Sequence, residues 1–166
     1  RNAVIGPESQ RIANINISKN HFVHRLNGNA YGVQLGYGAG ISAGTFNNNY
    51  VVGGTEAMLV MENSTNISGS GNKFYGSNPT IGGYVQMRSP TGYSWNNNTY
   101  YKATSQVFAN NGSIYDFAAW KTATGFDSNA TSTTTSMPNT VIVTPNIYEA
   151  GRANNCFYQL GSSWIK

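Results

Sequence analysis

The sequence predicts an all-β solenoid, in which short strands stack turn upon turn, and three observations support this fold class. The 166-residue chain is only 10% charged but is 39% hydrophobic and 13% aromatic, whereas disordered chains are poor in aromatic residues. Its apolar residues come in short bursts separated by glycine and asparagine, which is typical of strands joined by tight turns. An Asn-x-aromatic pattern returns at intervals of 28, 24 and 26 residues, and periods of about 20 to 50 residues indicate repeat folds.

The strands of the repeat are predicted from three segments that superpose at an offset of 26 residues: YGVQLG (31–36), AMLVME (57–62) and GYVQMR (83–88). Superposition yields two apolar columns that lie two residues apart, as one face of a strand requires. The columns are Val33, Leu59, Val85 and Leu35, Met61, Met87. A repeat of this length without a helical pattern predicts one turn of a parallel β-helix, with turns spanning residues 1–112.

Apolar residues also occupy positions that the same alternation directs outward, namely Met58, Val60 and Tyr84. Apolar side chains on a hydrated face are typical of contact surfaces. The ends of a strand stack also present unpaired backbone groups, and the N-terminal stretch offers only a proline-containing loop to cover them. We therefore expect the chain to associate with copies of itself or with the rest of a larger parent chain.

The recurring asparagines are predicted to form a ladder at one bend of each turn. The side-chain amide can donate to one turn and accept from the next, and asparagine tolerates the left-handed conformation that bends require. The aromatic residue two positions later would fill the core and stack on its counterpart. The predicted ladder consists of Asn20, Asn48, Asn72 and Asn98, with Phe22, Tyr50, Phe74 and Tyr100 as the aromatic residues. A row of ligand-binding asparagines is the alternative.

Residues 113–166 are predicted to close the same domain. A short helix is expected in YDFAAWKTATGFDSNA, with Ser113 and Asp116 as a capping box and Gly125 at its end. Strands 140–144 and 154–160 are expected to form a hairpin. Its closing turn contains four residues expected to pin it against the coil: Asn146, Tyr148, Glu149 and Arg152.

The repeat over residues 12–110 resembles the right-handed parallel β-helix superfamily, the pectin-lyase-like proteins, in the form found in secreted bacterial proteins. The stretches YDFAAWKTATGFDSNA and TVIVTPNIYEAGRAN resemble the closing segment of such proteins. The resemblance implies a right-handed coil, the C-terminal part of a secreted member, and a place outside the cell or on its surface. Members that cut polysaccharides carry Asn-Thr-Asp and Asp-Asp pairs, or several calcium-binding aspartates with an arginine or lysine base. Neither pattern occurs in this chain.

The sequence offers little for catalysis. No two of the six acidic residues lie within four positions of each other, whereas hydrolysis by paired carboxyl groups needs them about 5–9.5 Å apart. No metal-ligand cluster or cofactor motif is present, so no metal or cofactor is expected. The weak catalytic candidates are His21 and Lys73, which the repeat places in one outward column, because a lyase needs a cation and a base. Glu62 and Arg88 share another column on adjacent turns and should form an ion pair.

These features together predict an extracellular structural or adhesive module that self-associates or terminates a larger surface protein, without a catalytic site of its own. The net charge of +4 is scattered, whereas a nucleic-acid interface needs a cluster, and no apolar run approaches the roughly 20 residues of a membrane span. The alternative is a polysaccharide-binding module, or a fragment of a polysaccharide lyase or glycoside hydrolase. Fold alone does not decide between them.

Overall fold

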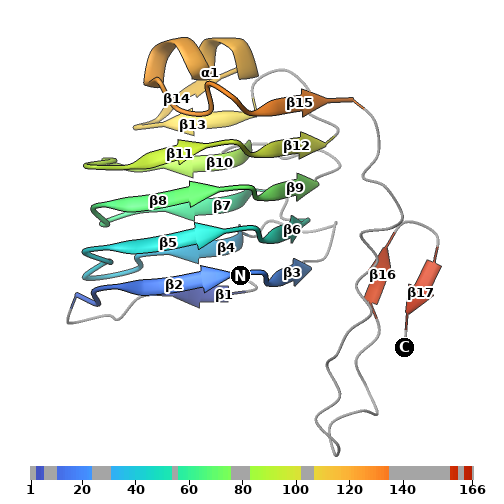
Figure 1. Cartoon of the computed structure of the whole chain (residues 1–166), viewed down its shortest axis with the longest axis horizontal. Coiled ribbons are helices and arrows are strands. Elements are labelled where there is room, and N and C mark those ends of the chain that lie inside the picture. The colour runs from blue at the N-terminus through green and yellow to red at the C-terminus, as the bar shows by residue number, and fades with distance from the viewer. Residues whose placement is uncertain are drawn as a thin grey trace, which may run out of the picture. The chain divides into compact units, whose positions relative to one another are not determined.

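The computed structural model describes residues 3–5, 11–23, 31–53, 56–75, 83–101, 107–134, 158–160 and 163–165. The chain divides into two compact units, residues 1–136 and 137–166. The first unit consists mostly of parallel strands in stacked sheets (Figure 1). This arrangement confirms the predicted dominance of parallel β-structure and is compatible with a β-helix-like fold.

Three sheets make up the first unit. Sheet 1 contains β1 (Ala3–Ile5), β4 (Tyr31–Leu35), β7 (Ala57–Met61), β10 (Gly83–Met87), β13 (Phe108–Asn110) and β14 (Ser113–Tyr115). Sheet 2 contains β2 (Ile15–Ser18), β5 (Gly44–Asn47), β8 (Ile67–Ser70) and β11 (Ser94–Asn96). Sheet 3 contains β3 (His21–Val23), β6 (Tyr50–Val52), β9 (Lys73–Tyr75), β12 (Thr99–Tyr101) and β15 (Thr131–Thr133). All their pairings are parallel except that of β13 with β14.

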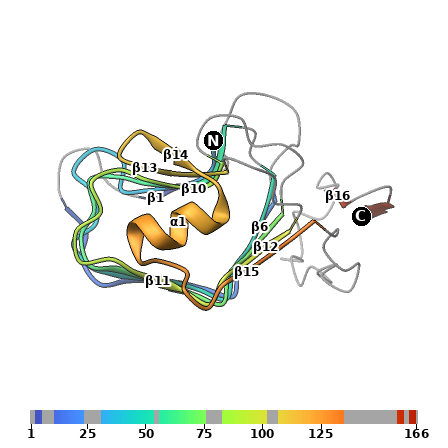
Figure 2. The ribbon, with the colours of Figure 1, turned by 90° about the horizontal axis from the view of Figure 1, so that it is seen from above.

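Successive segments of the chain add one strand to each sheet in turn, and we call three such strands a rung. The strands β4, β5 and β6 form one rung, and β7, β8 and β9 form the next. From above, the rungs follow one another along the same outline (Figure 2). Within sheet 1, Val33 pairs with Leu59 and Leu59 with Val85, so the predicted apolar columns align as expected.

Aromatic and aliphatic side chains from all three sheets fill the interior. Phe74 stacks on Tyr100 at 5.2 Å between ring centroids, and Phe46 and Trp95 lie 6.3 Å apart. All four are buried. Their parallel rings one rung apart reflect the strand spacing of about 4.8 Å, so the core is a stack of side chains from equivalent positions.

The predicted outward patch is wrong, because Met58, Val60 and Tyr84 are each fully buried. Met58 and Tyr84 belong to the core cluster. The Tyr84 hydroxyl donates to the Tyr101 carbonyl, which lies in sheet 3, so this side chain turns into the corner between two sheets. Strict inside–outside alternation holds only along a regular strand, and it fails at these positions. This patch therefore supplies no exposed apolar interface.

The C-terminal part of the first unit closes its stack. The helix α1 (Phe117–Thr124) lies across the outline of the sheets (Figure 2). Asp116 is its N-cap, and its carboxylate accepts from the Ala119 amide at 2.8 Å. Gly125 ends the helix with φ at 71°. Ser113 lies in β14 and does not cap the helix, which corrects the predicted capping box. The helix buries Trp120 against Phe108, with ring centroids 5.3 Å apart.

The second unit is described only at β16 (Tyr158–Leu160) and β17 (Ser163–Ile165), which pair antiparallel. The predicted strand 140–144 lies outside the described residues. So do the residues predicted for the closing turn: Asn146, Tyr148, Glu149 and Arg152. Within the described parts of the chain, no helix is both long and apolar enough to cross a membrane.

Candidate functional site

An asparagine ladder runs up the corner between sheets 2 and 3. Asn20, Asn72 and Asn98 occupy it as the sequence predicts, but the remaining position belongs to Asn49, not Asn48. Asn48 lies one residue earlier, with φ at 55°. The aromatic column shifts with the ladder, because Val51 pairs with both Phe22 and Phe74 where Tyr50 was expected.

Each ladder amide bonds to the rungs on either side of it. Asn72 Oδ1 accepts from the backbone amide of Asn49 at 3.0 Å and from its Nδ2 at 3.2 Å. Asn72 Nδ2 donates to Asn98 Oδ1 at 3.0 Å and to the Phe46 carbonyl at 2.7 Å. Asn72 is fully buried. The amide therefore satisfies backbone groups that the corner removes from the strand ladders.

A buried carboxylate ends the ladder beneath α1. Asp127 Oδ1 accepts from Asn98 Nδ2 at 2.9 Å. Its Oδ2 accepts from the Tyr100 hydroxyl at 2.6 Å and from Trp120 Nε1 at 3.2 Å. Burial raises the pKa of Asp127 above its ordinary value, although these three donors act in the opposite direction. Burial and the nearby Asp127 carboxylate raise the pKa of Tyr100, so its hydroxyl remains a donor.

The opposite end of the ladder is open among the described residues. Asn20 is exposed, and its Nδ2 donates to the Ser18 carbonyl on its own strand at 3.1 Å. The corresponding Nδ2 of Asn49 instead reaches the Ile17 carbonyl in the rung below at 2.9 Å. No described residue donates to Asn20 Oδ1. The strands β1, β2 and β3 are the edge strands of their sheets at this end.

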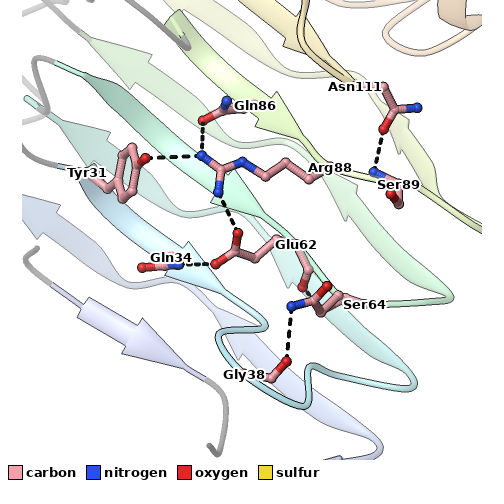
Figure 3. Close-up of polar contacts among 10 residues, drawn as sticks. Tyr31, Gln34, Gly38, Glu62, Ser64, Gln86, Arg88, Ser89 and Asn111 are labelled. Carbon is pink, nitrogen blue, oxygen red and sulfur yellow. Dashed lines mark hydrogen bonds and ion pairs between the residues drawn. The ribbon is translucent and has the colours of Figure 1, made fainter.

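A polar cluster lies on the outer face of sheet 1 (Figure 3). The predicted ion pair is confirmed, with Arg88 Nη1 2.7 Å from Glu62 Oε2. Arg88 Nη2 also donates to the Tyr31 hydroxyl at 3.1 Å and lies 3.4 Å from Gln86 Oε1. Gln34 Nε2 donates to the other Glu62 oxygen. The cluster therefore links β4, β7 and β10 across one face.

The electrostatics of this cluster favour a fixed positive charge at its centre. Partial burial opposes the charge of Arg88, but the contacts with Tyr31 and Glu62 outweigh it and raise the pKa of the guanidinium. The Arg88 side chain retains 43% of its exposure, against 13% for Glu62. The face thus offers an accessible guanidinium beside a tyrosine hydroxyl and two amides, all groups that bind hydroxyl or carboxylate oxygens.

The predicted basic stripe forms a stack on the outer face of sheet 3. His21 and Lys73 flank Tyr50, not Asn49 as predicted, because each pairs with Tyr50 in register. The His21 ring stacks on Tyr50 at 4.6 Å with an interplanar angle of 8°. Lys73 Nζ lies 5.1 Å from the centroid of the same ring and donates to its hydroxyl at 3.2 Å. Both faces of Tyr50 are thus covered, which leaves no face for a sugar ring.

The described residues do not bring acidic groups together. Glu62 faces outward on sheet 1, whereas Asp127 is buried beneath α1. No group of three or more potential metal ligands occurs among the described residues. Of the five aromatic residues with exposed rings expected for sugar stacking, Tyr84 and Trp95 are buried, while Tyr31, Tyr37 and Tyr93 are partly exposed.

No protein-family model, curated protein or solved structure matches the chain. The candidate sites therefore rest on their own geometry.

Proposed function

We propose that this chain is an extracellular structural or adhesive module that closes one end of a right-handed parallel β-helical solenoid. It would have a repeat of about 26 residues, in a protein resembling the pectin-lyase-like superfamily. It either terminates a larger surface protein or associates with copies of itself, and it carries no catalytic site of its own. The observation that supports this role is the difference between the two ends of the stack.

At the α1 end, a different element covers the last strand of each sheet. Sheet 1 ends in the antiparallel strand β14, and sheet 3 ends in β15. In sheet 2, the Asp127 backbone amide donates to the Trp95 carbonyl at 2.7 Å, which covers β11. Because an open edge is a template for strand addition, these elements would stop growth of the stack at this end.

The closing role is tested by opening the α1 end and measuring solution mass by light scattering across a dilution series. Trp120→Ala removes the buried anchor of α1, and Phe126→Ser is a milder second variant in case the first does not fold. Thr122→Ala on the exposed face of the same helix is the matched control. We expect the mass of the opened variants to rise with concentration while that of the control matches the parent. A folded Trp120→Ala chain with the parent's mass at every concentration would refute the closing role.

A second candidate function, polysaccharide binding, is supported by the polar cluster on sheet 1. Arg88 and Tyr31 present a cation and a hydroxyl on a flat face, which suits an acidic or hydroxyl-rich chain. The test is a panel of neutral and acidic polysaccharides, assayed for binding and for cleavage. Arg88→Ala should abolish binding, whereas Asn16→Ala on the outer face of sheet 2 should not. Equal binding by both variants would remove sheet 1 as the site.

A further inference from the structure

The structure assigns a specific partner to the N-terminal end of the stack, and this inference rests on the proposed closing role of the chain. We infer that the end formed by β1, β2 and β3 binds a further rung of parallel strands whose corner residue is an asparagine. That rung would come from polypeptide outside residues 1–166, not from a second copy of this chain. The evidence lies in the ladder, in the strand edges and in the exposure of the core.

The ladder specifies the hydrogen-bonding groups of the partner. In the rungs above, each Oδ1 accepts from the backbone amide and Nδ2 of the asparagine one rung lower. Asn20 Oδ1 has no such donors among the described residues, and Asn20 Nδ2 turns back to Ser18. A partner rung with asparagine at this corner supplies both missing donors, and its strand supplies the carbonyl that Ile17 provides for Asn49.

The backbone of the same corner repeats one connection at every rung. Tyr50 donates its amide to the Asn20 carbonyl at 2.9 Å, and Lys73 donates to Asn49 at 2.8 Å. His21 is the equivalent residue of the first rung, and β3, which contains it, has β6 as its only strand partner among the described residues. The partner rung must therefore run parallel to β3 and offer a carbonyl to His21.

The core is also less covered at this end than elsewhere. Phe22 is only partly buried, whereas Val51, its partner in the next rung, is fully buried. Ile15 and Ile17 are likewise half-buried, and Ile12 is 37% exposed. The apolar columns thus stop at an exposed surface. Another rung would continue a rung-to-rung interface that the chain already repeats.

A second copy of this chain does not supply such a rung. The α1 end of a copy is covered by β14, by β15 and by the turn at Asp127. Its other end would meet the first only head to head, with strands running antiparallel and with no parallel asparagine corner. The ladder requires parallel strands, so the partner is a different β-coil.

The test uses the full chain with one coil of its own sequence as the probe. A copy of residues 57–82, joined directly before residue 1, would place the copied Leu59 in the register with Ala3 that Leu59 holds with Val85. The copied Asn72 then lies at the ladder corner below Asn20. Asn20→Ala is made in the parent and in the extended chain, and stability is measured as the urea midpoint. Asn16→Ala, an exposed residue of the same rung, is the matched control.

We expect Asn20→Ala to lower the urea midpoint several-fold more in the extended chain than in the parent, because only there does the amide bond to two rungs. Asn16→Ala should have the same effect in both chains. In the extended chain, exchange of the Asn20 side-chain amide protons should slow about tenfold or more. Replacing the copied Asn72 by leucine should abolish both effects.

Equal effects of Asn20→Ala in the two chains would overturn the inference. So would a parent chain that is a dimer dissociated by Asn20→Ala, because a second copy would then occupy this end. Failure of the closing role is a separate result, since it is read from the mass of the Trp120 and Phe126 variants and not from Asn20.

Discussion

The asparagine ladder leads to a quantitative prediction, which compares Asn72→Leu with Asn48→Gly. Both asparagines were expected in the ladder from the sequence, but only Asn72 lies in it. Leucine has nearly the shape of asparagine and no polar atoms. Glycine suits the positive φ of Asn48. The two substitutions therefore separate the role of the ladder from that of the turn beside it.

The magnitude follows from the groups that Asn72→Leu leaves without partners. The Asn49 backbone amide loses its acceptor, and the Phe46 carbonyl loses the Asn72 donor; both residues are fully buried. Each unsatisfied buried group costs about 1–3 kcal/mol, and apolar burial of leucine offsets part of this cost. We expect a net loss of about 2–4 kcal/mol of folding free energy. Asn48 is exposed, so Asn48→Gly should change stability by less than about 0.5 kcal/mol.

The assay is urea denaturation followed by tryptophan fluorescence, since Trp95 and Trp120 are buried in the first unit. A loss of 2–4 kcal/mol, by the reasoning above, lowers the midpoint by roughly 1–2 M at a typical slope. Asn49→Leu should fall between the two, because Asn20, whose amide it orphans, is open to water. Equal midpoints for Asn72→Leu and Asn48→Gly would refute the ladder as a source of stability.

Three further predictions concern the closure, the packing and the outer stack. Because burial raises the pKa of Asp127, the folded state holds this proton more tightly than the unfolded state. Stability should therefore fall as pH rises from the ordinary aspartate pKa to the raised one, and Asp127→Asn should remove that slope from urea midpoints measured across pH. Gly69→Ala should cost about 1–3 kcal/mol by overpacking, because its Cβ would lie 1.9 Å from the buried ring of Trp95; denaturation of both chains measures this. Burial lowers the pKa of His21, and NMR titration should show Tyr50→Ala returning it towards its ordinary value.

The columns of sheet 1 were predictable because the segments containing Val33, Leu59 and Val85 keep a constant offset of 26 residues. Asn49 was missed because three asparagines precede Tyr50, and aromatic matching chose the wrong one. A shift of one residue reverses which side chains face inward. A usable signal lay one position earlier, where Lys19, Asn48, Gly71 and Asn97 all have positive φ. Glycine and asparagine at three of those four positions mark the bend before each ladder residue.

Burial of Met58 and Tyr84 was not predictable from alternation. Each stands directly before another core residue, Leu59 or Val85, so two neighbours both point inward. The β10–β13 register also shifts between Gly83 and Val85. Such a reversal belongs to the corner, where the chain changes sheet, and a period-two pattern does not locate corners. The Asp127 network was missed for a related reason, since its donors come from three elements distant in sequence.

The chemistry of the ladder makes its two ends unequal. Each asparagine passes a hydrogen bond upward through Nδ2 and receives one from below through Oδ1. At the top, Asn98 donates to Asp127, and an ionised carboxylate only accepts, so the ladder cannot continue beyond it. At the bottom, Asn20 has an acceptor that no described residue uses. A chain of directional bonds that ends in an acceptor-only group at one end and an unmatched acceptor at the other can be extended only at the second. The polarity of the asparagine side chain thus selects the same end for extension as the covered and uncovered strand edges do.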